Sequence, residues 1–168
     1  PMPLVAKHSS GIFQVMHIYT HPEFIHHDVA EGHPERPDRL RHLLGHLDRE
    51  GILDDCQLRE PGDLSDAQIL AAHTTGHLEF LRRSEPTDGI VPIDPDTWMG
   101  PRSLNAARLA ASAVCSGVDD VLTGTEQRVF CAVRPPGHHA EANSAMGFCL
   151  LNSVAIAALH ALEQQDIN

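Results

Sequence analysis

An uninterrupted run of five apolar residues, Val129 to Val133, constrains the fold of this chain most strongly. Polar residues precede the run, and Pro135 follows it closely. A short apolar run with such boundaries is typical of a strand that is buried on both faces, and such strands occur mainly in parallel sheets. The run therefore predicts a buried strand in a parallel β-sheet.

Helical patterns surround this strand, as the crossover connections of a parallel sheet require. Leucines recur at helical spacing after Pro37 until Gly51, and Ser65 with Gln68 forms a capping box. We predict a strand at 16–19, loops at 22–37 and 90–100, and helices from about 37 and over 66–72, 76–83, 102–122 and 152–162. This order predicts an α/β fold with helices flanking a parallel sheet. Because no strand follows the last helix, we interpret the chain as ending before its sheet is complete.

Composition narrows the class of protein further. The 168 residues suffice for one domain, and 23 acidic against 12 basic residues give a net charge of −11, which argues against nucleic-acid binding. No apolar run approaches the roughly 20 residues that span a bilayer, and no leader is evident. The four cysteines form no CxxC motif, which predicts reduced thiols and a cytoplasmic location. Residues 1–15 are interpreted as a tail or extension, so that the domain is 16–168.

The segment after the predicted strand is the strongest candidate for chemistry, and it reads Arg134-Pro135-Pro136-Gly137-His138-His139. Ligands bind beyond the carboxyl ends of the strands in open α/β sheets. Two adjacent imidazoles can divide the work of catalysis, because one can take a proton from water while the other protonates a leaving group or stabilises an oxyanion. The alternative interpretation is a proline-rich turn with two solvated histidines.

This segment resembles the histone deacetylase family. The similarity continues through Met146-Gly147-Phe148-Cys149-Leu150-Leu151-Asn152-Ser153, and it includes the earlier element His33-Pro34-Glu35-Arg36-Pro37-Asp38-Arg39-Leu40. It covers roughly 16–168 and is nearest to class II and bacterial members, whose relatives include acetylpolyamine amidohydrolases. The resemblance implies an arginase-like α/β fold and the zinc-dependent hydrolysis of an acetyl-lysine-type amide to acetate and a free amine.

The resemblance also implies roles for individual residues. His139 matches the family's general base and acid, and His138 matches its electrostatic partner. Gly147 and Phe148 match the pair that lines the narrow acyl-lysine channel, although on the sequence alone Phe148 is more simply interpreted as a core residue.

The resemblance implies functional roles for three further residues, and each of them also has a purely structural explanation. Arg39 matches an arginine beside the cavity through which acetate leaves, or it pairs with Asp38 or Glu35. Asp96, or else Asp94, matches a rim aspartate that binds the substrate backbone, or it caps its loop. Cys149 matches a cysteine beside the channel, or it is an inert buried thiol.

The metal ligands that the resemblance implies are not found in this sequence. A catalytic zinc site needs three protein ligands, which the family supplies as an Asp-x-His motif and a later aspartate. The spacing places them beyond Asn168, together with the carboxylates that orient the histidine pair and a later tyrosine. We therefore expect Zn²⁺ in the complete enzyme and none bound by this chain. Two groups contain side chains of metal-ligand type, namely His26-His27-Asp28 with His33, and His73 with His77 at i, i+4 on a helix. Neither offers an obvious complete ligand set, so we interpret both as polar residues on solvated surfaces.

The sequence thus predicts the N-terminal half of a zinc-dependent deacetylase that is inactive as this chain alone. One alternative keeps the enzyme and changes the substrate to an acetylpolyamine or another small acylamine. A second alternative is a non-catalytic half-domain, or a remnant, that associates with itself or with a complementing C-terminal half through an exposed sheet edge.

Overall fold

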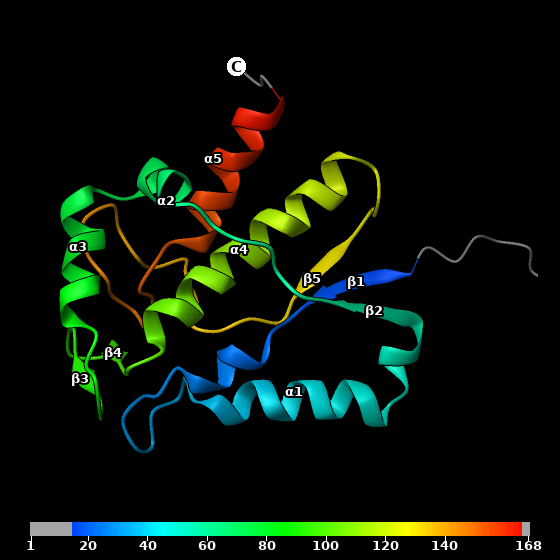
Figure 1. Cartoon of the computed structure of the whole chain (residues 1–168). Helices are drawn as coiled ribbons and strands as arrows, with labels where there is room; N and C mark the ends of the chain where they lie inside the picture. Colours follow the sequence, from blue (N-terminus) through cyan, green and yellow to red (C-terminus); the bar gives the residue numbers. More distant parts are fainter. Residues whose placement is uncertain (1–14, 166–168) are drawn as a thin grey trace, which may run out of the picture.

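The computed structural model describes residues 15–165, and it contains a short parallel sheet at one side of the molecule (Figure 1). Strand β1 (Met16–Tyr19) lies between β2 (Cys56–Arg59) and β5 (Val129–Cys131), and both neighbours run parallel to it. The predicted α/β class with a parallel sheet is therefore confirmed. The N-terminal tail predicted at 1–15 lies outside the described residues except for Val15.

Burial within the sheet differs from the expectation for the apolar run at 129–133. The central Ile18 is fully buried, whereas Phe130 of β5 is 39% exposed. The prediction that this strand is buried was wrong, because β5 is an edge strand of the described sheet and has β1 on one side only. The strand is also shorter than the run, since it ends at Cys131.

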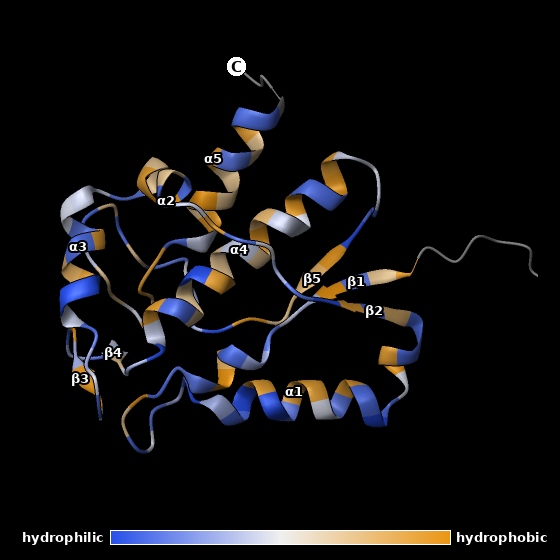
Figure 2. Cartoon of the chain, viewed as in Figure 1, coloured by the Kyte–Doolittle hydropathy of each residue, from blue (hydrophilic) through white to orange (hydrophobic). Residues whose placement is uncertain are grey.

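Two helices cover the sheet from opposite sides (Figure 1). Helix α1 (Pro37–Arg49) brings its leucines to a core that includes Ile18, Phe24 and Leu40, and helix α4 (Ser103–Leu122) brings alanines to the same core. Helix α4 packs closely on β5 at Gly117, where a Cβ would lie 3.0 Å from Val129 Cγ1, closer than ordinary van der Waals contact. Apolar residues occupy much of the three strands and recur along α1 (Figure 2).

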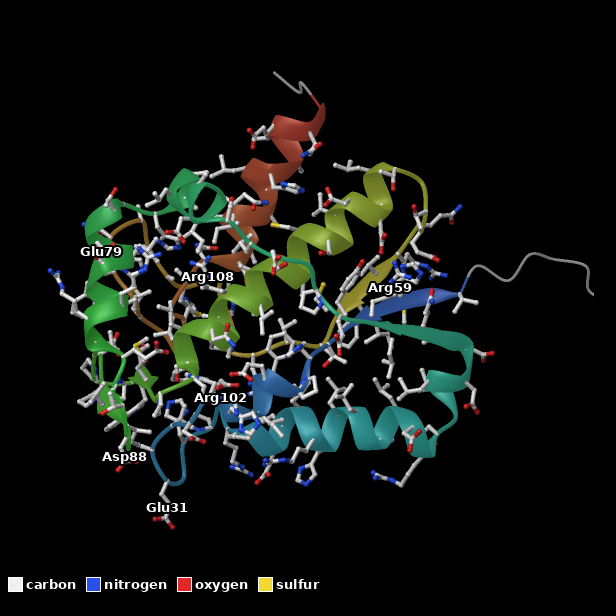
Figure 3. The ribbon with its side chains drawn as sticks, in the orientation of Figure 1. Glu31, Arg59, Glu79, Asp88, Arg102 and Arg108 are labelled. Atoms are coloured by element: carbon white, nitrogen blue, oxygen red, sulfur yellow. The ribbon has the colours of Figure 1, made fainter. Side chains whose placement is uncertain are left out.

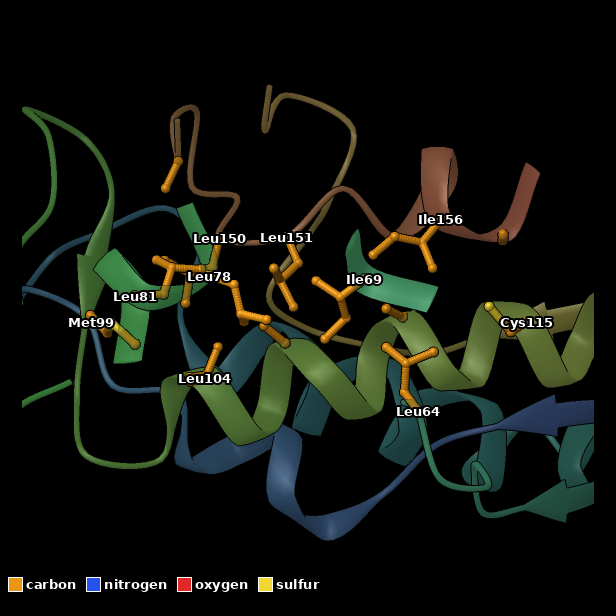
Figure 4. Packing of buried hydrophobic residues seen from close by; sticks show 14 residues of the cluster. Leu64, Ile69, Leu78, Leu81, Met99, Leu104, Cys115, Leu150, Leu151 and Ile156 are labelled. Carbon is orange, nitrogen blue, oxygen red and sulfur yellow. The ribbon is translucent and has the colours of Figure 1, made fainter. Parts of the chain in front are cut away.

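A second core lies on the other side of α4 (Figure 4). It is formed with helices α2 (Asp66–Ala72), α3 (Thr75–Ser84) and α5 (Ser153–Gln165). The predicted capping box of Ser65 and Gln68 is present, and Thr74 caps α3. The large buried side chains of this core are Leu64, Ile69, Leu78, Leu81, Met99, Leu104, Leu150, Leu151 and Ile156.

The remaining connections are more ordered than the sequence predicted. The loop at 22–37 begins with a 3₁₀ helix, η1 (Pro22–His26), which is joined to the start of α4 by the ion pair of Glu23 and Arg102 (Figure 3). The loop at 90–100 contains the two-stranded antiparallel hairpin β3 (Val91–Pro92) and β4 (Trp98–Met99). A second 3₁₀ helix, η2 (Ile52–Asp55), precedes β2. No helix among residues 15–165 is long and apolar enough to cross a membrane.

Candidate functional site

A cavity of about 790 Å³ opens beyond the carboxyl end of β5. Three segments line it, namely the start of α1 with the residues before it, the hairpin of β3 and β4, and the loop between β5 and α5. Six of the residues singled out from the sequence line this cavity together: Arg39, Asp96, His138, His139, Gly147 and Phe148. Asp94, the alternative to Asp96, lines it too, whereas Cys149 does not.

The two adjacent histidines lie at the surface of this cavity. Both side chains are exposed, and their ring centroids are 4.2 Å apart. Within the described part of the chain, no hydrogen bond to either ring is recorded. The backbone just before them packs directly on the start of α5, because a Cβ on Gly137 would lie 2.2 Å from Ser153 Oγ. This contact explains why a glycine precedes the histidine pair. It also holds the backbone at the start of the pair against α5.

Gly147 and Phe148 form the wall that faces the histidines. Gly147 has a φ of 56°, and a Cβ there would lie 2.7 Å from Cβ of His139. Phe148 has a φ of 70°, which costs a non-glycine residue about 1–3 kcal/mol and is seen most often at functional sites. The N–H of Phe148 donates to Oγ1 of the buried Thr97 over 3.0 Å, and this bond helps to hold the strained backbone. Since Phe148 is only half-buried, it is a wall of the cavity and not a core residue.

His33 connects this wall to the hairpin. Its ring meets the edge of Phe148 at a centroid distance of 4.7 Å. Its Nδ1 accepts the N–H of Glu35 over 3.1 Å, so its Nε2 carries the proton and donates to the carbonyl of Asp96, also over 3.1 Å. The sequence had placed His33 among solvated polar residues, and its position in the His33–Leu40 element was the one signal of this role.

A buried ion pair joins the two sequence elements that resemble the family. Arg134 and Glu35 form hydrogen bonds of 2.9 Å from Nε and 2.8 Å from Nη2, and each side chain is 2% exposed. Arg134 Nη1 also donates to the carbonyls of Phe24 and His27. The sequence suggested Glu35 only as a partner of Arg39 and gave no role to Arg134, because a partner 99 positions away leaves no local pattern.

His27 lies beside this pair and is buried, contrary to the expectation that it is solvated. Its Nδ1 is 2.7 Å from Ser103 Oγ, and its Nε2 is 3.7 Å from Glu35 Oε2. Burial, and then the neighbouring Arg134 and His33, lower the pKa of His27 to about 3. The ring is therefore neutral at physiological pH. The neighbouring His26 and Asp28 are exposed, as expected.

Charged residues of opposite sign lie on the cavity wall. Arg39 is 62% exposed at its side chain, and its Nη1 is 3.6 Å from Glu35 Oε1. It thus contacts Glu35, as its structural alternative proposed, and lines both the main cavity and a smaller one of about 210 Å³ beside β5. Asp96 is exposed. Partial burial opposes ionisation of Asp94, but hydrogen bonds from Asp96 and Thr97 hold the pKa of Asp94 below its ordinary value.

Cys149 lies under the wall and is fully buried. Its thiol donates to the carbonyl of Gly147 over 3.2 Å, and burial raises its pKa. This environment favours the inert-thiol interpretation, because the reactive form of cysteine is the thiolate.

The described residues do not by themselves fit a zinc centre. Residues 15–165 contain no group of three or more His, Cys, Asp or Glu side chains that could hold a metal ion. His73 and His77 were predicted to share a solvated helix face, and this was wrong: His73 caps the end of α2, His77 belongs to α3, and both are buried.

Comparisons with known proteins show which family this chain is similar to. The family model of the histone deacetylase domain matches residues 33–168. A probable deacetylase from Archaeoglobus fulgidus is 34% identical over 88% of this chain and 41% of its own length. The polyamine deacetylase HDAC10 from Homo sapiens is 33% identical over 84% of this chain and 22% of its own length.

The fold is also found among solved structures. The crystal structure of the HDA15 HD domain superposes with a TM-score of 0.82 at 32% identity, and the match covers 89% of this chain and 44% of that chain. The chain therefore spans less than half of the length of each of these relatives.

Proposed function

The chain belongs to the histone deacetylase family, and we propose that its cavity is part of a site that hydrolyses an acetyl-lysine-type amide to acetate and a free amine. Homologues with deacetylase names support a hydrolase of this type. One observation carries the proposal: two exposed imidazoles, 4.2 Å apart, face a glycine–phenylalanine wall in a cavity of about 790 Å³. The apolar side chain of Phe148 suits contact with the four-carbon stem of lysine, and the imidazoles suit proton transfer at its amide.

The proposed reaction assigns the proton transfers to His139. Its imidazole takes a proton from water as the water oxygen forms a bond to the acetyl carbon. When the carbon–nitrogen bond breaks, the same proton passes to the leaving amine, so that acetic acid and a neutral amine form. The acid then loses its remaining proton and the amine gains one at neutral pH, which gives acetate and an ammonium group. His138 stabilises the charge that develops on its neighbour's ring during these steps.

The family also implies a zinc ion, which would polarise the amide carbonyl. Its three ligands would have to come from outside the group of residues described here. The imidazoles of His138 and His139 have no carboxylate partner within 15–165, and such partners orient catalytic imidazoles in metal enzymes. We therefore propose that residues 1–168 alone do not turn over the substrate.

The remaining cavity residues have roles that follow from charge and position. The exposed Asp96 is placed to accept an N–H of the substrate backbone at the rim. The Arg39 guanidinium lies between the main cavity and the smaller one, where a positive charge would attract departing acetate. Both assignments are part of the proposal.

A second substrate class is an acetylpolyamine. Asp94 and Asp96 place two carboxylates on the cavity wall, and carboxylates attract the cationic amines of such a substrate. One human relative carries the name polyamine deacetylase.

A non-catalytic half-domain is a further candidate. The specific observation that favours it is the half-exposed Phe130 on the β5 edge, which offers backbone and side chain to another strand. A half-domain of this kind should form a dimer, or a complex with a complementing chain.

The cytoplasmic location of the protein also stays a prediction.

Acetate release tests these proposals. The native protein that contains this chain should release acetate from an acetyl-lysine peptide, and faster release from acetylspermidine would favour the polyamine alternative. Release from neither substrate would contradict the proposed function. The isolated 168-residue chain should release none, and measurable zinc-dependent release that a hydroxamate blocks would refute its proposed inactivity.

A further inference from the structure

The corner between α2 and α3 places two buried histidines beneath the loop that carries the cavity wall. His73 is 4% exposed and His77 is 2% exposed. Their rings stack at a centroid distance of 4.7 Å with an interplanar angle of 27°. Neither ring lines the cavity, so the proposed reaction does not use them.

Three hydrogen bonds run from this corner to the loop. Nε2 of His73 accepts the N–H of Asn152 over 2.8 Å, and Nε2 of His77 donates to the carbonyl of Leu150 over 2.9 Å. Between the two histidines, the N–H of Thr74 donates to the carbonyl of Ala142 over 2.8 Å. The corner therefore holds the loop at both ends.

In two neutral rings, these bonds require opposite tautomers. His73 accepts at Nε2, so its neutral ring carries the proton on Nδ1, whereas His77 donates from Nε2 and leaves Nδ1 as a lone pair. Both Nδ1 atoms are buried without a hydrogen-bond partner in the part of the chain that is described. Burial, and then the neighbouring His77, lower the pKa of His73. A second proton on either ring would add an unpartnered buried N–H and a charge, which is costly.

Asn152 connects the α2–α3 corner to the segment that contains His138 and His139. Its side-chain N–H donates to the carbonyl of Ala140 over 2.7 Å, and Ala140 directly follows His139. Its side-chain oxygen accepts the N–H of Ala155 and so caps α5. Leu150, held by His77, is two positions after Phe148. Both walls of the cavity are thus tied to the α2–α3 corner.

We propose that His73 and His77 are positioning residues that act as a pair of neutral imidazoles with opposite tautomers and fix the loop between Ala140 and Asn152. Their contribution to turnover rests on the proposed function. The tautomers and the fixed loop do not depend on it.

The direct test is nitrogen NMR of the histidine side chains in the full 168-residue chain near neutral pH. The spectrum should show His73 protonated on Nδ1 alone and His77 protonated on Nε2 alone. Two rings with the same tautomer, or a doubly protonated ring, would overturn the proposal. This measurement needs no variant, so it decides even where a substitution prevents folding.

Variants at His73 test the positioning role. The His73→Leu change removes the acceptor of the Asn152 N–H, and exchange of that amide should accelerate about five- to tenfold, the effect of one lost hydrogen bond. The ring signals of His138 and His139 should shift as well. The His73→Gln change restores an acceptor at nearly the same reach and should recover both readouts, while the exposed His42→Leu serves as a matched control. If His73→Leu leaves both readouts unchanged, or if glutamine behaves as leucine does, His73 is not a positioning residue.

Turnover of the native protein separates this inference from the proposed function. Acetate release should fall in the His73→Leu variant and recover in the His73→Gln variant. A protein that releases no acetate in any form contradicts the proposed function, while the NMR outcome still decides the tautomers.

Discussion

Glu35 and Arg134 form a doubly hydrogen-bonded ion pair that is almost completely buried and joins the two loops that form the cavity. Glu35 belongs to the segment that enters α1, and Arg134 begins the segment that leads to His138 and His139. The guanidinium also binds two backbone carbonyls of the chain after β1. The pair therefore fixes the position of the histidines relative to α1.

Removal of the Arg134 charge should destabilise the fold strongly. The Arg134→Met change leaves the Glu35 carboxylate buried without its partner, which typically costs about 3–5 kcal/mol. The matched control is Arg36→Met, because Arg36 forms an exposed pair with Asp38 at 4.0 Å, and such pairs contribute about 0–1 kcal/mol. Urea unfolding measures both, and equal losses in the two variants would contradict this account of the pair.

The Gly147→Ala change should displace His139 and reduce turnover of the native protein by about 100-fold, the cost of a misplacement near 1 Å. The added methyl would lie 2.7 Å from Cβ of His139. Gly124→Ala is the matched control, since Gly124 also has a positive φ, of 74°, but nothing lies within 4 Å of its added methyl. Because alanine is strained at a positive φ, each change should also lower the free energy of unfolding by about 1–2 kcal/mol. Similar turnover in the two variants would show that the close contact has no functional role.

Burial of neutral His27 should make the fold less stable in acid. In the unfolded chain His27 gains its proton as the pH falls through its ordinary pKa of 6.5, whereas in the fold the pKa is about 3. The unfolded state therefore binds more protons in this window, and stability is lost as the pH falls from about 6.5 towards 3, by up to about 1.4 kcal/mol per pH unit.

A substitution at His27 isolates the contribution of this residue to the loss of stability in acid. Asparagine can keep the hydrogen bond to Ser103 and does not titrate, so His27→Asn should lose less stability on acidification than the wild type does. Between about pH 7 and about pH 5, the difference in unfolding free energy between the two proteins should change by up to about 2 kcal/mol. The exposed His42→Asn variant should follow the wild type. A constant difference across this range would show that His27 is not a buried neutral group.

Cys149 should resist alkylation in the folded chain, because its thiol is buried and its pKa is raised. Mass spectrometry after treatment with iodoacetamide should find the half-buried Cys56 modified first, and Cys149 modified only when denaturant is added. Modification of Cys149 as fast as Cys56 in native buffer would instead indicate a reactive thiol beside the cavity.

The sequence predicted those features of the fold that depend on local chemistry. The periodic leucines and the capping box at Ser65 predicted helices α1 and α2, and the stretch at 16–19 predicted β1. The apolar run at 129–133 predicted the parallel strand β5, although that strand ends at Cys131 and is not buried. The cavity residues were found for a different reason, since their motifs resemble a family and imply a shared site.

What the sequence could not predict depends on partners far along the chain. Burial of His27 requires Ser103 and Arg134, and burial of His73 requires Asn152, so no local pattern reveals either. Phe130 is half-exposed because of the order of the strands, which periodicity does not encode. In each case packing decided whether a polar or apolar residue is exposed.

The most direct test of the central claim is acetate release from an acetyl-lysine peptide by the native protein that contains this chain, compared with its His139→Asn variant. Loss of the general base should reduce the rate roughly 10²- to 10⁴-fold while the circular dichroism spectrum stays unchanged. The exposed His42→Asn variant should keep the wild-type rate. A His139→Asn protein that releases acetate as fast as the wild type would contradict the assignment of this cavity as the deacetylase site.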